Sequence, residues 1–210
     1  DKILQLRGEL PMEVEALEAE IAELEPNKLN ISDSFDSDQF SWQWAGWREN
    51  ITKIASLKKG AAVLPARGAK PHEGHMMIAT APNYRYTIET QLSLGKKGNE
   101  AGMILYYSAK AYAGVMCNGE TLTIYKNATD VEQIPNKFGR SVYLKLENGG
   151  EKLNVLASAD GKKWEMLSEG IDIKDMHHNK LGDFISLRPA LCSTGEDEAK
   201  FQYFNYTPSE

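Results

Sequence analysis

Several kinds of sequence signal are scarce or missing in this chain of 210 residues. Cysteine occurs twice and histidine four times, and acidic residues outnumber basic ones, which gives a net charge of −6. Because binding to a phosphate backbone needs a basic surface, this charge argues against nucleic acid as a partner. No apolar run approaches the roughly 18 residues that a membrane-spanning helix needs, so no membrane span is expected.

Motifs of catalytic and metal sites are also missing. The chain has no GxSxG elbow, no glycine-rich phosphate loop, no HExxH helix and no EF-hand loop. Cys117 and Cys192 form neither a CxxC pair nor a Cys/His cluster at zinc spacing, which argues against structural zinc. A disulfide between them and two partly buried free thiols are equal alternatives. We therefore expect no catalytic residues.

The first 28 residues carry the pattern of one short amphipathic helix. Apolar residues spaced three or four apart form one face, namely Leu10, Val14, Leu17, Ile21 and Leu24. The opposite face is almost entirely glutamate. Such a helix either packs on a neighbouring domain or associates with a second copy, and we treat residues 1–28 as a segment separate from residues 29–210.

From about residue 29 onward, the pattern changes to the two-residue alternation of half-buried strands. The apolar side of the clearest run consists of Tyr84, Tyr86, Ile88, Thr90, Leu92 and Leu94. Further short runs are Met103–Tyr107, Tyr112–Cys117, Thr121–Tyr125, Val142–Leu146, Leu153–Ser158, Phe184–Leu187 and Phe201–Tyr206. The pairs Asn118-Gly119 and Asp160-Gly161 stand between such runs and predict hairpins. Many short strands joined by such turns predict an all-β sandwich or barrel of antiparallel strands, with loops at Lys58–His75 and Met176–Asp183.

Three of the four tryptophans, Trp42, Trp44 and Trp47, lie within six residues. We expect Trp42 and Trp44 to share one face of a strand, so at least one of them belongs to the core. An exposed tryptophan beside a polar partner such as Arg48 would instead form a platform on which a sugar ring stacks. The core interpretation is favoured, and the carbohydrate interpretation stays open.

An acidic turn precedes the tryptophans and offers the only candidate ligands for a metal. Asp33, Asp36 and Asp38 could supply oxygens to calcium, which is the one cofactor that the sequence allows. Calcium requires six to eight oxygen ligands, so turn and capping roles explain these carboxylates at least as well.

Four segments, read in this order, resemble the C-terminal concanavalin-A-like domain of β-xylosidases in glycoside hydrolase family 43. The segments are Asp33–Trp44, Ala101–Tyr107 with Tyr112–Gly114, Ser158–Trp164 and Ala199–Tyr206. The likeness covers residues 32–208 and implies a concanavalin-A-like jelly roll. Gln202 departs from the family pattern, which often has aspartate at this place, and weakens any claim of a metal or buried carboxylate there.

The resemblance implies a non-catalytic module that packs on a five-bladed catalytic propeller of a bacterial enzyme. In some relatives, a loop of this module helps to shape the active site of the propeller. The loop Met176–Asp183 is the candidate here, with His177, His178 and Asn179 at its tip. The expected partners are therefore carbohydrate, of the xylan or arabinan type or another glycan, and a catalytic propeller or other partner chain.

Three functions remain open from the sequence. The first is an accessory or carbohydrate-binding module, the second a docking or structural domain, and the third a small glycoside hydrolase on the same fold. The first is favoured, and it predicts a periplasmic or extracellular location.

Overall fold

The computed structural model describes residues 29–95, 98–182 and 185–209, and residues 31–210 form one compact unit. The helix expected within residues 1–28 lies outside the described residues, so this helix and the boundary that follows it stay predictions.

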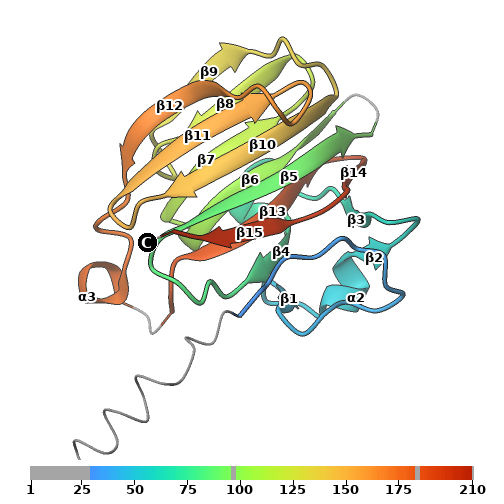
Figure 1. The fold of residues 1–210 in the computed structure, drawn as a ribbon, viewed down its shortest axis with the longest axis horizontal. Helices are drawn as coiled ribbons and strands as arrows, with labels where there is room; N and C mark the ends of the chain where they lie inside the picture. Colours follow the sequence, from blue (N-terminus) through green and yellow to red (C-terminus); the bar gives the residue numbers. More distant parts are fainter. Residues whose placement is uncertain (1–28, 96–97, 183–184, 210) are drawn as a thin grey trace, which may run out of the picture. The chain divides into compact units, whose positions relative to one another are not determined.

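The compact unit is a sandwich of two antiparallel sheets (Figure 1). One sheet contains, in spatial order, β1 (Trp44–Gly46), β4 (His75–Ala79), β13 (Arg188–Gly195), β6 (Asn99–Ser108), β7 (Ala111–Cys117), β8 (Thr121–Tyr125) and β9 (Val131–Pro135). The other contains β12 (Glu165–Asp172), β11 (Lys152–Ser158), β10 (Ser141–Asn148), β5 (Tyr86–Leu94), β14 (Glu198–Phe201), β3 (Ala62–Pro65) and β2 (Ser56–Leu57), and β15 (Asn205–Pro208) also pairs with β5. The predicted concanavalin-A-like jelly roll is confirmed.

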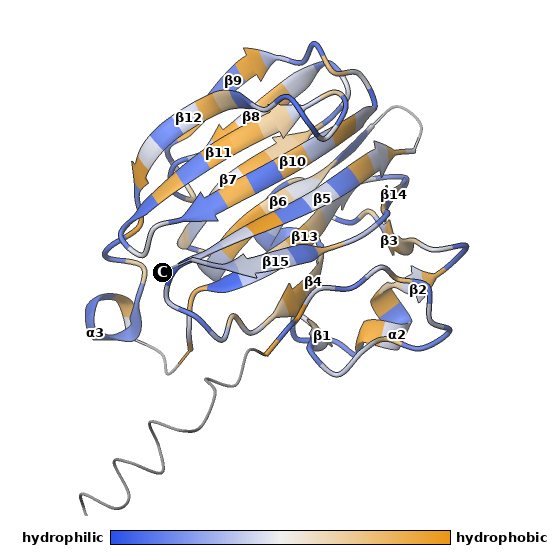
Figure 2. Ribbon diagram, in the orientation of Figure 1, coloured by the Kyte–Doolittle hydropathy of each residue, from blue (hydrophilic) through white to orange (hydrophobic). Residues whose placement is uncertain are grey.

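Alternation of side chains places the core between the sheets. Along β5, every second residue from Tyr86 to Leu94 is buried, while Tyr84 precedes the strand and is exposed. Figure 2 shows the same alternation of apolar and polar residues along β10 and β11. Because successive side chains of a strand point to opposite faces, one face of this sheet meets the core and the other meets solvent.

The two predicted hairpin turns are present and are held by their own side chains. Asn118 Oδ1 accepts hydrogen bonds from the backbone N–H groups of Glu120 and Thr121 between β7 and β8. Asp160 Oδ1 accepts from the backbone N–H groups of Lys162 and Lys163 between β11 and β12. These hydrogen bonds to the ionised form lower the pKa of Asp160 to about 2.

Several boundaries differ from the predictions. The expected loop Lys58–His75 contains β3 and the one-turn 3-10 helix η1 (Pro71–Glu73). The strand expected at Phe184–Leu187 is wrong, because its described residues 185–187 precede β13. The closing run Phe201–Tyr206 is divided between β14 and β15. No predicted run corresponds to β2, β4, β9, β12 or β13.

A second apolar cluster covers the outer face of the seven-stranded sheet. It consists of Met76, Ile78, Ile104, Tyr106, Tyr112, Met116, Tyr125, Ala190 and Cys192. η1 packs here, since the Cys192 thiol contacts the Pro71 carbonyl at 3.4 Å and the His72 ring lies 6.1 Å from the Tyr112 ring. The tyrosines of this face are consequently buried and do not present a flat surface to solvent.

The two cysteines are free thiols on opposite faces of the seven-stranded sheet. Cys117 belongs to the core between the sheets, and Cys192 belongs to the outer cluster. Ala101 and Gly102, their partners on β6, are adjacent residues and therefore also face opposite ways. A disulfide would have to cross the sheet, so the free-thiol alternative describes this structure.

Both thiols should resist alkylation in the native protein and react fully after unfolding. Burial raises the pKa of Cys117 to about 11 and raises that of Cys192 further, so neither forms the reactive thiolate at pH 8. Mass spectrometry after iodoacetamide treatment, with and without guanidinium chloride, measures this. Labelling of the folded protein, or no labelling of the unfolded and unreduced protein, would contradict it.

Candidate functional site

The three neighbouring tryptophans occupy three different environments. Trp44 is in the core, where its indole N–H donates to Asp33 Oδ2 at 2.9 Å. Trp42 lies in the turn before β1 and is 74% exposed. The expectation that Trp42 and Trp44 share a strand face is therefore wrong, because only Trp44 lies on the strand.

Trp47 is half-buried and already has several partners. Its ring meets the Tyr106 ring edge-on at a centroid distance of 5.1 Å. The guanidinium carbons of Arg48 and Arg188 lie 5.1 and 5.0 Å from its centroid. These cation–π contacts occupy the ring that a sugar would need for stacking. Of the three tryptophans, Trp42 is thus the one with its ring free to meet a ligand.

The acidic turn has a structural role in the described chain. Asp33 Oδ1 accepts from the Phe35 N–H at 2.8 Å, while its other oxygen holds the Trp44 indole. Among residues 29–95, 98–182 and 185–209, no three His, Cys, Asp or Glu side chains form a group that could hold a metal ion. The calcium site considered for Asp33, Asp36 and Asp38 is therefore not assembled by the described residues.

The segment 173–187 carries the predicted loop. Its described part 173–182 is anchored, because Ile173 and Met176 are buried and the Tyr107 hydroxyl donates to the Gly182 carbonyl. Between these anchors lies a one-turn helix, α3 (His178–Leu181), which was not predicted. The tip residues His177, His178 and Asn179 are exposed.

A hollow of about 370 Å³ separates this segment from residues 81–86. His177 and His178 both line it. Asn179 is not among its lining residues. Tyr84, 68% exposed, stands at the hollow, while the side chain of Tyr86 is buried beside it. Both apolar and hydrogen-bonding groups are thus available to a partner.

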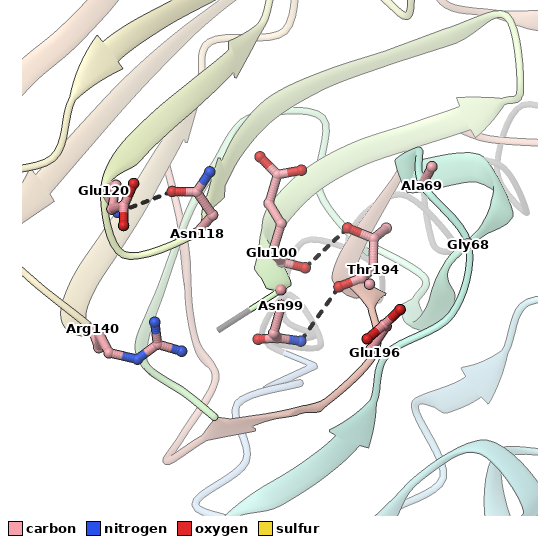
Figure 3. Close-up of a pocket in the computed structure, with 11 residues that line it drawn as sticks. Gly68, Ala69, Asn99, Glu100, Asn118, Glu120, Arg140, Thr194 and Glu196 are labelled. Atoms are coloured by element: carbon pink, nitrogen blue, oxygen red, sulfur yellow. Dashed lines mark hydrogen bonds between the residues drawn. The ribbon is translucent and has the colours of Figure 1, made fainter. Parts of the chain in front are cut away.

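A larger cleft of about 730 Å³ lies elsewhere in the sandwich and was missed from the sequence (Figure 3). It is formed by the start of β6, the β7–β8 turn, the residue before β10, the end of β13 and the segment that leads to η1. Its described lining residues are Gly68, Ala69, Gly98, Asn99, Glu100, Asn118, Glu120, Arg140, Thr194, Gly195 and Glu196. None of them has an aromatic side chain or an aliphatic one larger than alanine, so the cleft is a polar site.

Glu100 is the central side chain of this cleft. Its Oε1 accepts from the Thr123 hydroxyl at 2.8 Å. Burial raises the pKa of Glu100, and the Thr123 hydrogen bond opposes this shift only in part. The carboxylate is thus partly buried with one hydrogen bond to stabilise its charge, an arrangement that is common in sites that bind a ligand.

A protein-family model described as the C-terminal concanavalin-A-like domain of β-xylosidase matches residues 32–207. No functionally curated protein matches the sequence. Among solved structures, the family 43 protein BlXynB from Bacillus licheniformis is 17% identical with a TM-score of 0.72 over 89% of this chain. A xylan β-1,4-xylosidase from Bacillus halodurans is 19% identical with a TM-score of 0.71 over 88% of this chain.

A third similar structure, GH43B of the xyloglucan utilisation locus of Bacteroides ovatus, is 14% identical with a TM-score of 0.73 over 89% of this chain. The match covers 41% of that protein and 40% of each of the other two. The chain thus spans less than half the length of these proteins, and at such identities the likeness shows the fold alone. Within the described residues, no helix is long and apolar enough to cross a membrane.

Proposed function

The chain belongs to the family of β-xylosidase C-terminal concanavalin-A-like domains, and we propose that it is the non-catalytic accessory module of a family 43 glycoside hydrolase. The observation that carries the proposal is the family match over nearly the whole sandwich, together with solved relatives of more than twice this length. In those relatives, the matching part accompanies a catalytic propeller. The substrate class would be a xylan- or arabinan-type glycan.

The segment 173–187 is the surface that we assign to the contact with the catalytic domain. Its anchored part 173–182 holds the position of α3, while its tip exposes two imidazoles and the half-exposed side chain of Leu181. The lining of the hollow beside it includes the apolar side chains of Ile173, Met176 and Leu187. A partner that fills this hollow would bury apolar surface.

We also propose a bacterial origin and a periplasmic or extracellular location. Polymeric plant glycans lie outside the cell, and an enzyme that acts on them must be exported. Fractionation of the native host, followed by immunodetection of this chain, would test the location.

The proposal is tested by kinetics of the chain together with the family 43 propeller that we expect in the same protein or a neighbouring gene. Replacing His177 and His178 together by alanine should lower kcat/KM on an aryl xyloside by about tenfold, because an interface contact worth about 1.4 kcal/mol is lost. The chain alone should not hydrolyse the substrate.

The double replacement Lys162→Ala and Lys163→Ala is the matched control. These adjacent, exposed side chains lie on the β11–β12 turn, where only their backbone N–H groups are used. The control should keep the unmodified kcat/KM. Hydrolysis by the chain alone, or equal kinetics for the histidine variant and the control, would contradict the accessory role assigned to this segment.

A further inference from the structure

The large polar cleft beside Glu100 is separate from the segment 173–187, and the proposed docking role does not use it. No lining residue is shared between the cleft and the hollow at that segment. Five stretches of the chain converge on the cleft, and their polar side chains point into a space that no described side chain fills (Figure 3).

A donor and an acceptor face this space from neighbouring strands. Asn118 uses Oδ1 to accept two backbone hydrogen bonds of its own turn, so the orientation of its amide is fixed and Nδ2 remains as a donor. Glu100 uses one carboxylate oxygen for Thr123, and the second remains as an acceptor. Figure 3 shows Asn118 Nδ2 on the side of its amide nearest the Glu100 carboxylate. A hydroxyl group is the ligand that both accepts from an amide and donates to a carboxylate.

Asn99 gives an independent indication of a missing partner. It is 1% exposed, and its Nδ2 donates to the Ser193 hydroxyl at 3.1 Å. Its Oδ1 is buried beside the cleft and has no hydrogen-bond partner among the described residues. An unpaired buried carbonyl costs free energy, so this wall of the cleft is incompletely satisfied.

The charges of the cleft restrict the class of ligand. Among the lining residues that the structure describes, Glu100, Glu120 and Glu196 stand against one cation, Arg140, whose guanidinium already donates to the Gly95 carbonyl. An anionic ligand would therefore be repelled. A peptide would lack the apolar anchor pockets that dominate peptide binding, because no described lining side chain is aromatic or an aliphatic one larger than alanine.

We propose that this cleft is a binding subsite for a neutral, hydroxyl-rich saccharide, with Glu100 and Asn118 as the paired acceptor and donor for its hydroxyl groups. That the ligand is a saccharide rests on the proposed accessory function. That it is neutral and rich in hydroxyl groups rests on the donor, the acceptor and the acidic charges of the cleft. The subsite would hold a polysaccharide chain near the catalytic domain without taking part in hydrolysis.

The test is calorimetric titration with xylohexaose, linear arabinohexaose and cellohexaose, and with oligogalacturonate as the anionic probe. At least one neutral oligosaccharide should bind, and oligogalacturonate should not. Glu100→Gln keeps an oxygen for Thr123 and should weaken binding at least tenfold. Asn118→Asp keeps the Oδ1 that caps the turn but removes the donor, and it should weaken binding to a similar degree.

Glu151→Gln, the same change of charge at an exposed turn residue, is the control and should bind as the unmodified protein does. Thermal unfolding shows whether each variant remains folded, and chemical shifts of the Asn118 side-chain amide locate the ligand. Absence of binding by all neutral probes, equal binding by Glu100→Gln, or preference for oligogalacturonate overturns the saccharide subsite. None of these results affects the kinetics of the histidine variant, so the two proposals fail separately.

Discussion

Replacement of Trp44 by alanine is expected to lower the free energy of unfolding by about 3–5 kcal/mol, the range for removal of a large buried aromatic side chain. Its ring packs edge-on against Phe204 at a centroid distance of 5.0 Å and lies 5.7 Å from Phe35. Its indole N–H also holds Asp33, whose backbone pairs with that of Phe204. Trp44 therefore joins the start of the sandwich to its closing strands, which are distant in sequence.

Urea unfolding followed by circular dichroism measures this loss, and Trp42→Ala is the matched control. Trp42 is 74% exposed, so its removal should change the free energy of unfolding by less than about 0.5 kcal/mol. Trp44→Phe should give an intermediate loss, because it keeps an aromatic ring but leaves the Asp33 carboxylate without the indole donor. Equal losses for Trp42→Ala and Trp44→Ala would contradict the placement of the two rings.

The sequence predicted β5 to β8, β10 and β11 well, but not β13 in the middle of the seven-stranded sheet. Along β5, one face meets the core and the other meets solvent, and the alternation of residues records this difference directly. The Asn118-Gly119 and Asp160-Gly161 turns were equally clear, since their hydrogen bonds are local and depend on the side chain of the first residue.

The strands that were missed lie where burial does not alternate. β9 is exposed or half-buried along its whole length, and β12 buries one residue, Ile171, so neither shows a two-residue period. β3 is four residues long and stands in a stretch rich in Gly, Pro and Lys. These strands are formed by pairing with neighbours, and local sequence does not contain that information.

The site residues were harder to predict for the same reason. The prediction that at least one tryptophan belongs to the core is confirmed by Trp44, but the placement of Trp42 on the same strand face was wrong. That placement depended on where β1 begins, which is a matter of one or two residues. The cleft depends on Glu100 and Asn118 meeting across the β6–β7 pair, 18 residues apart. Neither residue belongs to a motif, and both look like ordinary strand and turn residues until the register is known.

The β6–β7 pair that brings these two residues together depends on a close approach at Gly102. A Cβ atom added there would lie 2.0 Å from the Val115 carbonyl oxygen and 2.9 Å from the Met116 Cα, both in the backbone of β7. Gly102 is buried and pairs with Met116 of β7 on one side and Cys192 of β13 on the other. Because β13 lies directly behind it, β6 cannot move away from β7. Relief of the clash requires β7 to move away from β6.

Gly102→Ala should therefore lower the free energy of unfolding by about 1–3 kcal/mol, as for an overpacked core. Asn118 directly follows β7, and Glu100 lies two residues before Gly102 on β6. The same movement of β7 would therefore carry Asn118 away from Glu100. If the saccharide subsite exists, this variant should also bind the neutral oligosaccharide more weakly while remaining folded.

Gly170→Ala separates the clash from the loss of a glycine. Gly170 has a φ of 67°, and an added Cβ would meet no atom within 4 Å, so this variant carries only the strain of the left-handed backbone, about 1–2 kcal/mol. It should leave oligosaccharide affinity unchanged, because Gly170 lies on β12 in the other sheet. Urea unfolding and calorimetric titration of both variants give the comparison. Unaltered affinity in folded Gly102→Ala would show that the subsite does not require the close approach of the two strands.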